Sequence, residues 1–231
     1  MNCSQVKKQI LSKKLFFTFL VLLTNLLLTA VLAENATRNE RTDPSNFEYI
    51  VEDDNTVTIT KYTGTSKDIL IPHTLGGLSV TKIGDSAFSG KFLLSIDIPD
   101  TVHSIGNNAF KNNWLQTVAF PDSVQSIGDS AFADNLLETV SLPDSVTSLG
   151  AFAFSNCREL ESVELSANLS SLSKGLFYQC YKLATIEIPN SVTTLDDWVF
   201  SDCKILETVI IPEGIISIGK AVFPNCDALT S

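Results

Sequence analysis

An apolar pattern with a period of 22 or 23 residues runs through most of the chain. Its clearest marker is a phenylalanine that recurs seven times, three times at a step of 22 and then three times at a step of 23: Phe88, Phe110, Phe132, Phe154, Phe177, Phe200 and Phe223. A fixed period of this length is typical of a solenoid in which each repeat forms one coil. The pattern therefore predicts a repeat solenoid, mainly β, with about seven stacked coils.

Each unit also has a pattern of its own. Aligned on the phenylalanines, it reads L-x-x-[IV]-x-[IL]-P-x-x-V-x-x-[IL]-G-x-x-A-F, followed by a variable tail. The alternation before the proline predicts a strand with one buried face, which the proline ends because it has no N–H to donate. The second apolar pair starts a return leg. The glycine is expected at a bend with positive φ, and the segment up to Ala-Phe predicts a short helical turn.

The two ends of this array differ. At the N-terminal side, residues 47–51 and 57–59 alternate around the acidic turn 52–55, which predicts a β-hairpin that caps the first coil, within 47–68. The repeats follow over 69–231, and the last one is incomplete beyond Phe223. A strand stack with an open edge favours weak end-to-end self-association.

The repeat resembles the BspA-like (Treponema pallidum type) leucine-rich repeat of bacterial surface proteins. The unit L-x-x-I-x-I-P-x-x-V-x-x-I-G-x-x-A-F-x-x-C carries the resemblance over residues 69–231. Two coils depart from it: Ser166, Ser173 and Leu176 replace the proline, glycine and alanine of one, and Asp196 replaces the glycine of the next. The resemblance implies a leucine-rich-repeat-like array and a protein that adheres to host or partner-cell proteins.

The first 33 residues are set apart by composition. Four lysines precede an apolar run over 15–28, and Val31-Leu32-Ala33 supplies small residues of the kind that a signal peptidase reads. This predicts a secretory signal peptide, with an uncleaved membrane anchor as the alternative reading. Residues 34–46 are polar and are expected to form a flexible spacer. The sequence thus favours a secreted, periplasmic or cell-surface protein without membrane insertion after cleavage.

Charge narrows the range of partners. Cleavage after residue 33 leaves 12 basic against 26 acidic residues, a net charge of −14. Nucleic acids and anionic membrane surfaces reward Lys and Arg, so neither is an expected partner. Glycosylation sequons occur at Asn35 and Asn168, and they matter only in a host that glycosylates exported proteins.

Four cysteines form a column along the array. Cys157, Cys180, Cys203 and Cys226 each follow a repeat phenylalanine by three residues, where the earlier coils hold Lys91, Asn113 and Asn135. Stacked coils would bring the cysteines close enough for disulfides, which export favours. Cysteine also packs as a small apolar residue, and we expect free, buried thiols.

Residues suited to catalysis or cofactor binding are sparse. The two histidines, His73 and His103, lie on different coils with no nucleophile at a meaningful spacing, and no phosphate-binding or dinucleotide-binding motif occurs. The turn acids Asp100, Asp122 and Asp144 would each offer one ligand, whereas calcium takes six to eight oxygens. The sequence predicts a protein that is not an enzyme and has no metal or cofactor.

Function in a solenoid lies on the residues that the repeat leaves free. The most variable outward position of the first strand holds Asp97, Ala119, Ser141, Glu164, Glu187 and Ile210, and it becomes acidic near Glu161. We expect any partner-binding site at Asp97, Glu161, Glu164 and Glu187, with Trp114 and Tyr181 of the tails as aromatic anchors.

Two classes of function remain. The first is a secreted or surface-displayed binding scaffold that contacts a protein or matrix ligand through its sheet face. The second is a structural or assembly module of the cell envelope, or one part of a larger surface protein.

Overall fold

A computed structural model describes residues 42–229, which form one compact unit. The predicted signal peptide, the sequon at Asn35 and most of the predicted spacer lie outside the described residues. Within residues 42–229, no helix is long and apolar enough to cross a membrane.

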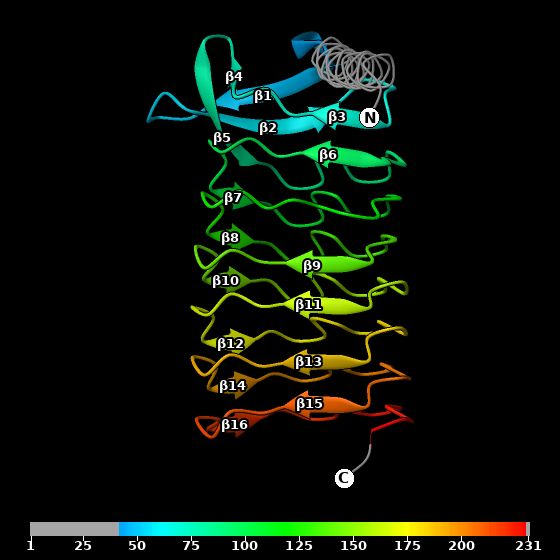
Figure 1. Ribbon diagram of the computed structural model, residues 1–231. Coiled ribbons are helices and arrows are strands. Elements are labelled where there is room, and N and C mark those ends of the chain that lie inside the picture. The colour runs from blue at the N-terminus through cyan, green and yellow to red at the C-terminus, as the bar shows by residue number, and fades with distance from the viewer. Residues whose placement is uncertain (1–41, 230–231) are drawn as a thin grey trace, which may run out of the picture. The chain divides into compact units, whose positions relative to one another are not determined.

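Short strands of successive coils line two sides of the solenoid (Figure 1). On the first side, the coil of residues 115–132 contributes a single bridge, between Ala119 and Asp97, in place of a strand. The face that we call the front sheet is made of three strand pairs: β3 (Asp68–Leu70) with β6 (Ser95–Asp97), β9 (Thr139–Ser141) with β11 (Ser162–Glu164), and β13 (Thr185–Glu187) with β15 (Thr208–Ile210). The face that we call the back sheet has two parts: the first contains β5 (Leu78–Ile83), β7 (Ser104–Ile105), β8 (Ser126–Ile127) and β10 (Ser148–Leu149), and the second contains β12 (Ser171–Leu172), β14 (Thr194–Leu195) and β16 (Ser217–Ile218). Paired strands from successive coils are parallel, and equivalent repeat positions lie opposite each other. The predicted solenoid is confirmed.

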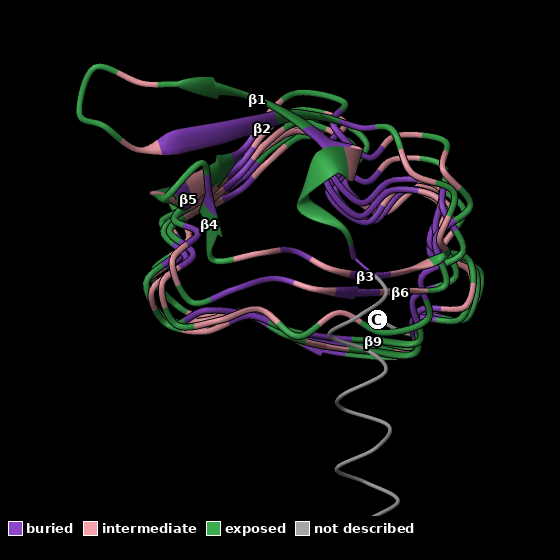
Figure 2. Ribbon diagram, turned by 90° about the horizontal axis from the view of Figure 1, so that it is seen from above, coloured by how far each residue is buried: buried purple, intermediate pink, exposed green. Residues whose placement is uncertain are grey.

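The core is a column of stacked rings inside the coils, and Figure 2 shows the buried residues along the inner side of the superposed turns. Successive repeat phenylalanines from Phe88 to Phe223 lie with ring centroids 5.1–6.2 Å apart and planes within 20° of parallel. Tyr62 extends the column by one ring, 5.7 Å from Phe88. Tyr62 precedes Phe88 by 26 residues and so falls outside the period of 22 or 23 residues in the sequence. The extra residues form β4 (Thr74–Leu75) and its turn to β5.

The N-terminal strands form a hairpin, as the alternation predicts. Strand β1 (Phe47–Val51) pairs antiparallel with β2 (Val57–Tyr62), and β2 continues the back sheet by pairing parallel with β5. The short 3-10 helix η1 (Pro44–Asn46) precedes β1, and Thr42 Oγ1 accepts a hydrogen bond from Leu70 N. The end of the predicted spacer is therefore ordered against the first coil.

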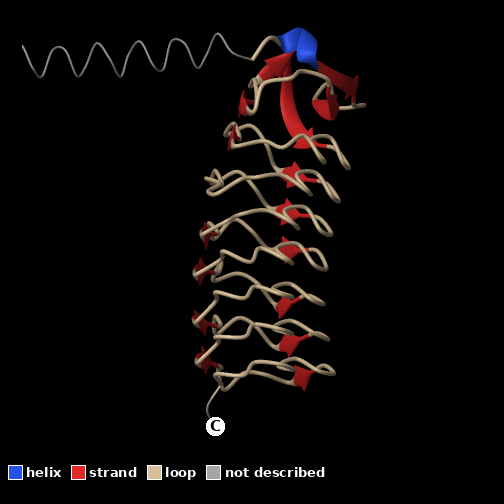
Figure 3. Cartoon of the chain, turned by 90° about the vertical axis from the view of Figure 1, so that its right-hand side faces the viewer, coloured by secondary structure: helices blue, strands red, loops and turns tan. Residues whose placement is uncertain are grey.

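The third side of each coil is a stack of turns, visible in Figure 3 between the two sets of strands. The predicted helical turn is wrong here, because every second N–H bonds to the next coil. Phe88 N donates to Ala109 O at 2.8 Å, and Phe110 N donates to Ala131 O at 2.8 Å. Each coil has two residues with left-handed backbone, one located two positions before the phenylalanine and one located two positions after it. In the first coil these are Ser86 and Gly90, and they direct the N–H groups along the solenoid axis.

The repeat glycines also differ from expectation, since none of them is among the positive-φ residues. Their role is to leave room for the coil before them. Asp85 Oδ1 accepts a hydrogen bond from Asn107 N across the coil boundary at 2.7 Å, and a Cβ on Gly106 would lie 2.5 Å from the same oxygen. The same arrangement recurs at Gly128, Gly150 and Gly219, which face Asn107, Asp129 and Asp197.

This contact explains the two coils in which the repeat glycine is replaced. Ser173 stands where glycine is usual, and the preceding coil holds Ala151 in place of the Asp or Asn that would reach over it. Asp196 is the second departure, and the preceding coil holds Lys174. Four repeat glycines thus lie beneath an Asp or Asn of the previous coil, and glycine is replaced in the two coils whose predecessor lacks that residue; Gly84, in the first coil, instead lies against the backbone oxygen of Ile59.

Candidate functional site

The front sheet carries a hollow of about 430 Å³ at the strands β11 and β13. Alternation along each strand points Val163 and Ile186 inward and leaves Glu164 and Glu187 exposed. The prolines and turns that follow the strands form the rest of the wall. The lining residues are Val163, Glu164, Leu165, Ala167, Glu187, Pro189, Asn190 and Ser191.

Two carboxylates give this hollow its charge. Glu164 accepts a hydrogen bond of 2.7 Å from Ser141 Oγ, which fixes it against the neighbouring strand. Across residues 42–229, neither Glu164 nor Glu187 forms an ion pair with a basic side chain. The hollow therefore combines an apolar floor with two carboxylates that can accept hydrogen bonds from a cationic group.

The other predicted acids lie outside the hollow. Glu161 lies before β11, and its carboxylate is 3.9 Å from Lys182 Nζ. Lys182 Nζ lies closer to Glu159, at 2.6 Å, and the pKa of this amine is raised chiefly by the hydrogen bond to Glu159. Asp97 belongs to β6, several coils away from β11 along the same column.

The predicted aromatic anchors lie on the tails, at the corner that leads into the front strands. Trp114 is 49% exposed, and its ring lies 5.0 Å from that of Phe92 beside a second hollow of about 360 Å³. The Tyr181 ring holds two cations, Arg158 Cζ at 5.2 Å and Lys204 Nζ at 5.3 Å. Tyr181 is therefore already engaged within its own chain.

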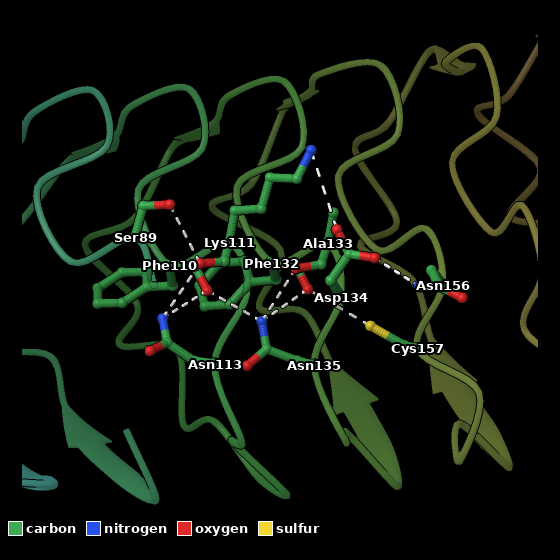
Figure 4. A network of polar contacts seen from close by, with 10 residues as sticks. All are labelled: Ser89, Phe110, Lys111, Asn113, Phe132, Ala133, Asp134, Asn135, Asn156 and Cys157. Atoms are coloured by element: carbon green, nitrogen blue, oxygen red, sulfur yellow. Dashed lines mark hydrogen bonds and ion pairs between the residues drawn. The ribbon is translucent and has the colours of Figure 1, made fainter. Parts of the chain in front are cut away.

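A buried polar column lies beneath this corner (Figure 4). Asn135 Nδ2 donates to Phe110 O and Phe132 O, at 3.0 and 2.9 Å, while its Oδ1 accepts from Leu115 N. Asn113 bonds in the same way one coil earlier. The thiol of Cys157 takes the next place in the column, with Sγ 3.4 Å from Phe132 O.

This column accounts for the change of period. The longer tails have one more residue after the cysteine, so their leucine N–H closes a turn onto its own coil, as in Leu160 N to Cys157 O at 3.1 Å. From Cys180 onward, therefore, the leucine N–H of the previous coil needs no amide oxygen at this column. The four thiols are free in the structure. Burial raises the pKa of Cys157 from 9.0 to about 12, which keeps this thiol protonated and poorly nucleophilic.

The described residues bring together no recognisable catalytic group. His73 Nδ1 lies 3.1 Å from Asp100 Oδ1 in an exposed pair, and His103 Nδ1 lies 3.1 Å from Ser123 O. Across the same residues, no three His, Cys, Asp or Glu side chains are placed to hold a metal ion. Asn168, the second sequon, is exposed, and its Nδ2 donates to Asp144 O.

Comparisons with known proteins agree with this architecture. The family model of the BspA type leucine rich repeat region matches in six copies, over residues 81–207 and 125–231. A leucine-rich repeat protein of T. pallidum shares 29% identity with a TM-score of 0.76, over 82% of this chain and 91% of its own. One from Bacteroides ovatus shares 27% identity with a TM-score of 0.59, over 75% of this chain and 54% of its own. Among curated proteins, none matches.

Proposed function

The chain belongs to the BspA-type leucine-rich repeat family, and from this premise we propose that it is a non-enzymatic scaffold that binds another protein through its front sheet. The observation that carries the proposal is the hollow between Glu164 and Glu187, which has an apolar floor and two carboxylates outside any ion pair of the described residues. A solenoid that supplies a surface and no reaction suits recognition.

The chemistry of the hollow favours a basic partner segment. A Lys or Arg side chain that enters it would place its apolar stem on Val163, Leu165 and Pro189 and its charge at the carboxylates. The net charge of the chain, −10, would speed the approach of such a partner at low ionic strength.

Capture of ligands by the immobilised protein tests this function. Envelope and extracellular-matrix proteins are passed over the wild type and over the double variant Glu164→Lys/Glu187→Lys, and bound proteins are identified. We expect the double variant to lose a partner that the wild type retains, and salt to weaken that capture.

A matched control changes the same total charge elsewhere. Asp53→Lys/Asp227→Lys alters two exposed acids in the hairpin turn and the last coil, and it should retain the partner. If both double variants lost the partner equally, net charge would explain the result and the hollow would not be the site. Unaltered capture by Glu164→Lys/Glu187→Lys would also contradict the proposal.

We also propose that residues 1–33 export the chain to the cell surface or beyond. The basic start, the apolar run and the Val31-Leu32-Ala33 end support export. Sequencing the N-terminus of the exported protein should find Glu34 first, whereas an intact Met1 in the membrane fraction would identify an anchor.

A further inference from the structure

A third hollow, of about 300 Å³, lies on the third side of the coils, away from the front sheet. It is lined by three aromatic side chains, one carboxylate and two smaller residues: Phe152, Tyr178, Trp198, Asp202, Ser201 and Pro224. The ring of Phe152 stands edge-on to that of Tyr178, with centroids 6.3 Å apart and planes at 85°. No function proposed above uses these residues.

The solenoid does not require aromatic residues at this place. Phe152 and Trp198 occupy the left-handed position two residues before the repeat phenylalanine, with φ of 59° and 62°. The other coils hold Ser86, Asn108, Ser130, Gly175 and Ala221 there. Bulky residues are outliers at positive φ, and such outliers gather at functional sites.

The coil between the two aromatic residues makes room for the hollow. Gly175 lies between Phe152 and Trp198 along the column, and a Cβ at this glycine would lie against the Phe152 ring. Trp198 remains 41% exposed. Two aromatic rings thus face a shared space on the surface, separated by a residue with no side chain.

The walls of this hollow suit a cation. Aromatic faces carry the negative part of the ring quadrupole, and the Trp198 ring already attracts Lys174 Nζ, 4.7 Å from its centroid. The carboxylate of Asp202 is held in place by Asn225 Nδ2 at 2.9 Å and is only partly buried. Lys174 is not among the lining residues, so the hollow itself contains a carboxylate and no cation.

We propose that this hollow binds an arginine side chain of a partner polypeptide. A guanidinium is planar, stacks on aromatic faces and offers paired N–H donors to a carboxylate, which a compact ammonium does not. Phe152, Tyr178 and Trp198 supply the faces, and Asp202 supplies the acceptor. The site goes beyond the function proposed for the front sheet and does not depend on it.

Tryptophan fluorescence can test the proposal without knowledge of the partner. The chain has two tryptophans, so Trp114→Phe leaves Trp198 as the only reporter. N-acetyl-arginine amide is titrated into this variant, and we expect a saturable change in Trp198 emission with a dissociation constant on the order of 1 mM. The same titration is repeated with N-acetyl-lysine amide and with tetramethylammonium.

Further changes in the Trp114→Phe background locate the binding. Asp202→Asn and Phe152→Ser should each weaken arginine binding by about tenfold or more. Phe152→Ser should leave the fold intact, because Ser130 occupies the equivalent position one coil earlier. Asp134→Asn, at the repeat position equivalent to Asp202, serves as the control and should bind like the parent.

Several outcomes would overturn the assignment. These are an unsaturable titration, arginine binding that Asp202→Asn leaves intact, and equal loss in Asp134→Asn. Tetramethylammonium binding that is as tight as arginine binding would identify a cage for quaternary ammonium groups instead. Lys174→Ala should bind at least as well as the parent, because it removes a competing cation, and lost binding in this variant would contradict the proposal.

Discussion

At the scale of single residues, the contacts between coils decide which side chains the repeat accepts. At Gly106, Gly128, Gly150 and Gly219, glycine is needed because the Asp or Asn of the previous coil reaches over it. Where the previous coil holds Ala151 or Lys174, serine and aspartate take the place of glycine. The identity of one residue therefore depends on a neighbour about 22 positions earlier.

Gly150→Ala should destabilise the protein by about 1–3 kcal/mol, because the new Cβ would lie 2.5 Å from Asp129 Oδ1 and against the backbone of the previous coil. Urea denaturation followed by circular dichroism measures the loss. Asp196→Ala is the control at the equivalent position, where we expect a change within about 0.5 kcal/mol. Equal effects of the two substitutions would refute the explanation.

The buried asparagines make a second residue-scale prediction. Asn135→Ala removes the partner of Leu115 N and of the Phe110 and Phe132 carbonyls, so we expect a loss of about 3 kcal/mol or more in the free energy of unfolding. Cys180→Ala removes only a weak donor and a small volume, and it should cost about 1–2 kcal/mol. The same denaturation experiment ranks the two variants, and a reversed order would contradict this role for asparagine.

At the scale of elements, each coil is held by its neighbours more than by its own bonds. The turns before the repeat phenylalanine do not form helix, because every second N–H group bonds to the next coil. The same stacking carries the ring column from Tyr62 to Phe223 without a break. Damage to one coil should therefore spread to the coils on both sides.

Phe132→Ser tests this coupling. The ring lies 5.2 Å from Phe110 and 5.7 Å from Phe154, and it is fully buried. Loss of a buried phenylalanine costs about 3–5 kcal/mol, and we expect cooperative unfolding to disappear in a thermal melt. Phe92→Ser, at a half-exposed ring, should melt close to the wild type; an unchanged midpoint for Phe132→Ser would disprove the coupling.

At the scale of the whole molecule, the thiol column makes stability depend on alkaline pH. The folded chain keeps the thiol of Cys157 protonated, because burial raises its pKa from 9.0 to about 12, whereas the unfolded thiol ionises near its ordinary value. The stabilisation is thus complete below pH 9 and is lost as pH rises towards 12. Each thiol of this kind contributes about 1.4 kcal/mol per pH unit in that window.

Denaturation of the wild type and Cys157→Ala at several pH values between 8 and 11 measures this contribution. The wild type should lose more stability than the variant as pH rises above 9. Parallel curves for the two proteins would show that the buried thiol does not contribute.

End-to-end self-association stays a prediction at the same scale. The last described coil exposes apolar side chains, with Ile216 at 85% and Ile218 at 57%. Sedimentation of the 231-residue chain should depend on concentration, and Ile216→Lys should reduce that dependence. Ile205→Lys, on the tail corner, is the control; equal effects of both would exclude association through the coil edge.

The sequence by itself determined the fold, because a repeated apolar pattern leaves stacked coils as the arrangement that buries one phenylalanine per coil. It also placed the hairpin, the cysteine column and the exposed acids, since each follows from register alone. Of the predicted site residues, Glu164 and Glu187 share a hollow, whereas Asp97, Glu161, Trp114 and Tyr181 lie elsewhere. Register assigns a residue to a column but says nothing of its distance from other columns.

Tertiary structure alone decided the rest, because contacts between coils join residues that the pattern of one coil keeps apart. The sequence of the turns on the third side predicts helix, but every second N–H group of these turns bonds to a carbonyl of the neighbouring coil. The reason for glycine, the exchange of asparagine for cysteine and the hollow of Phe152, Tyr178 and Trp198 all arise between coils. Phe152 and Trp198 did break a column of small residues in the sequence, but only the backbone showed that the column is left-handed and that its aromatic members face one hollow.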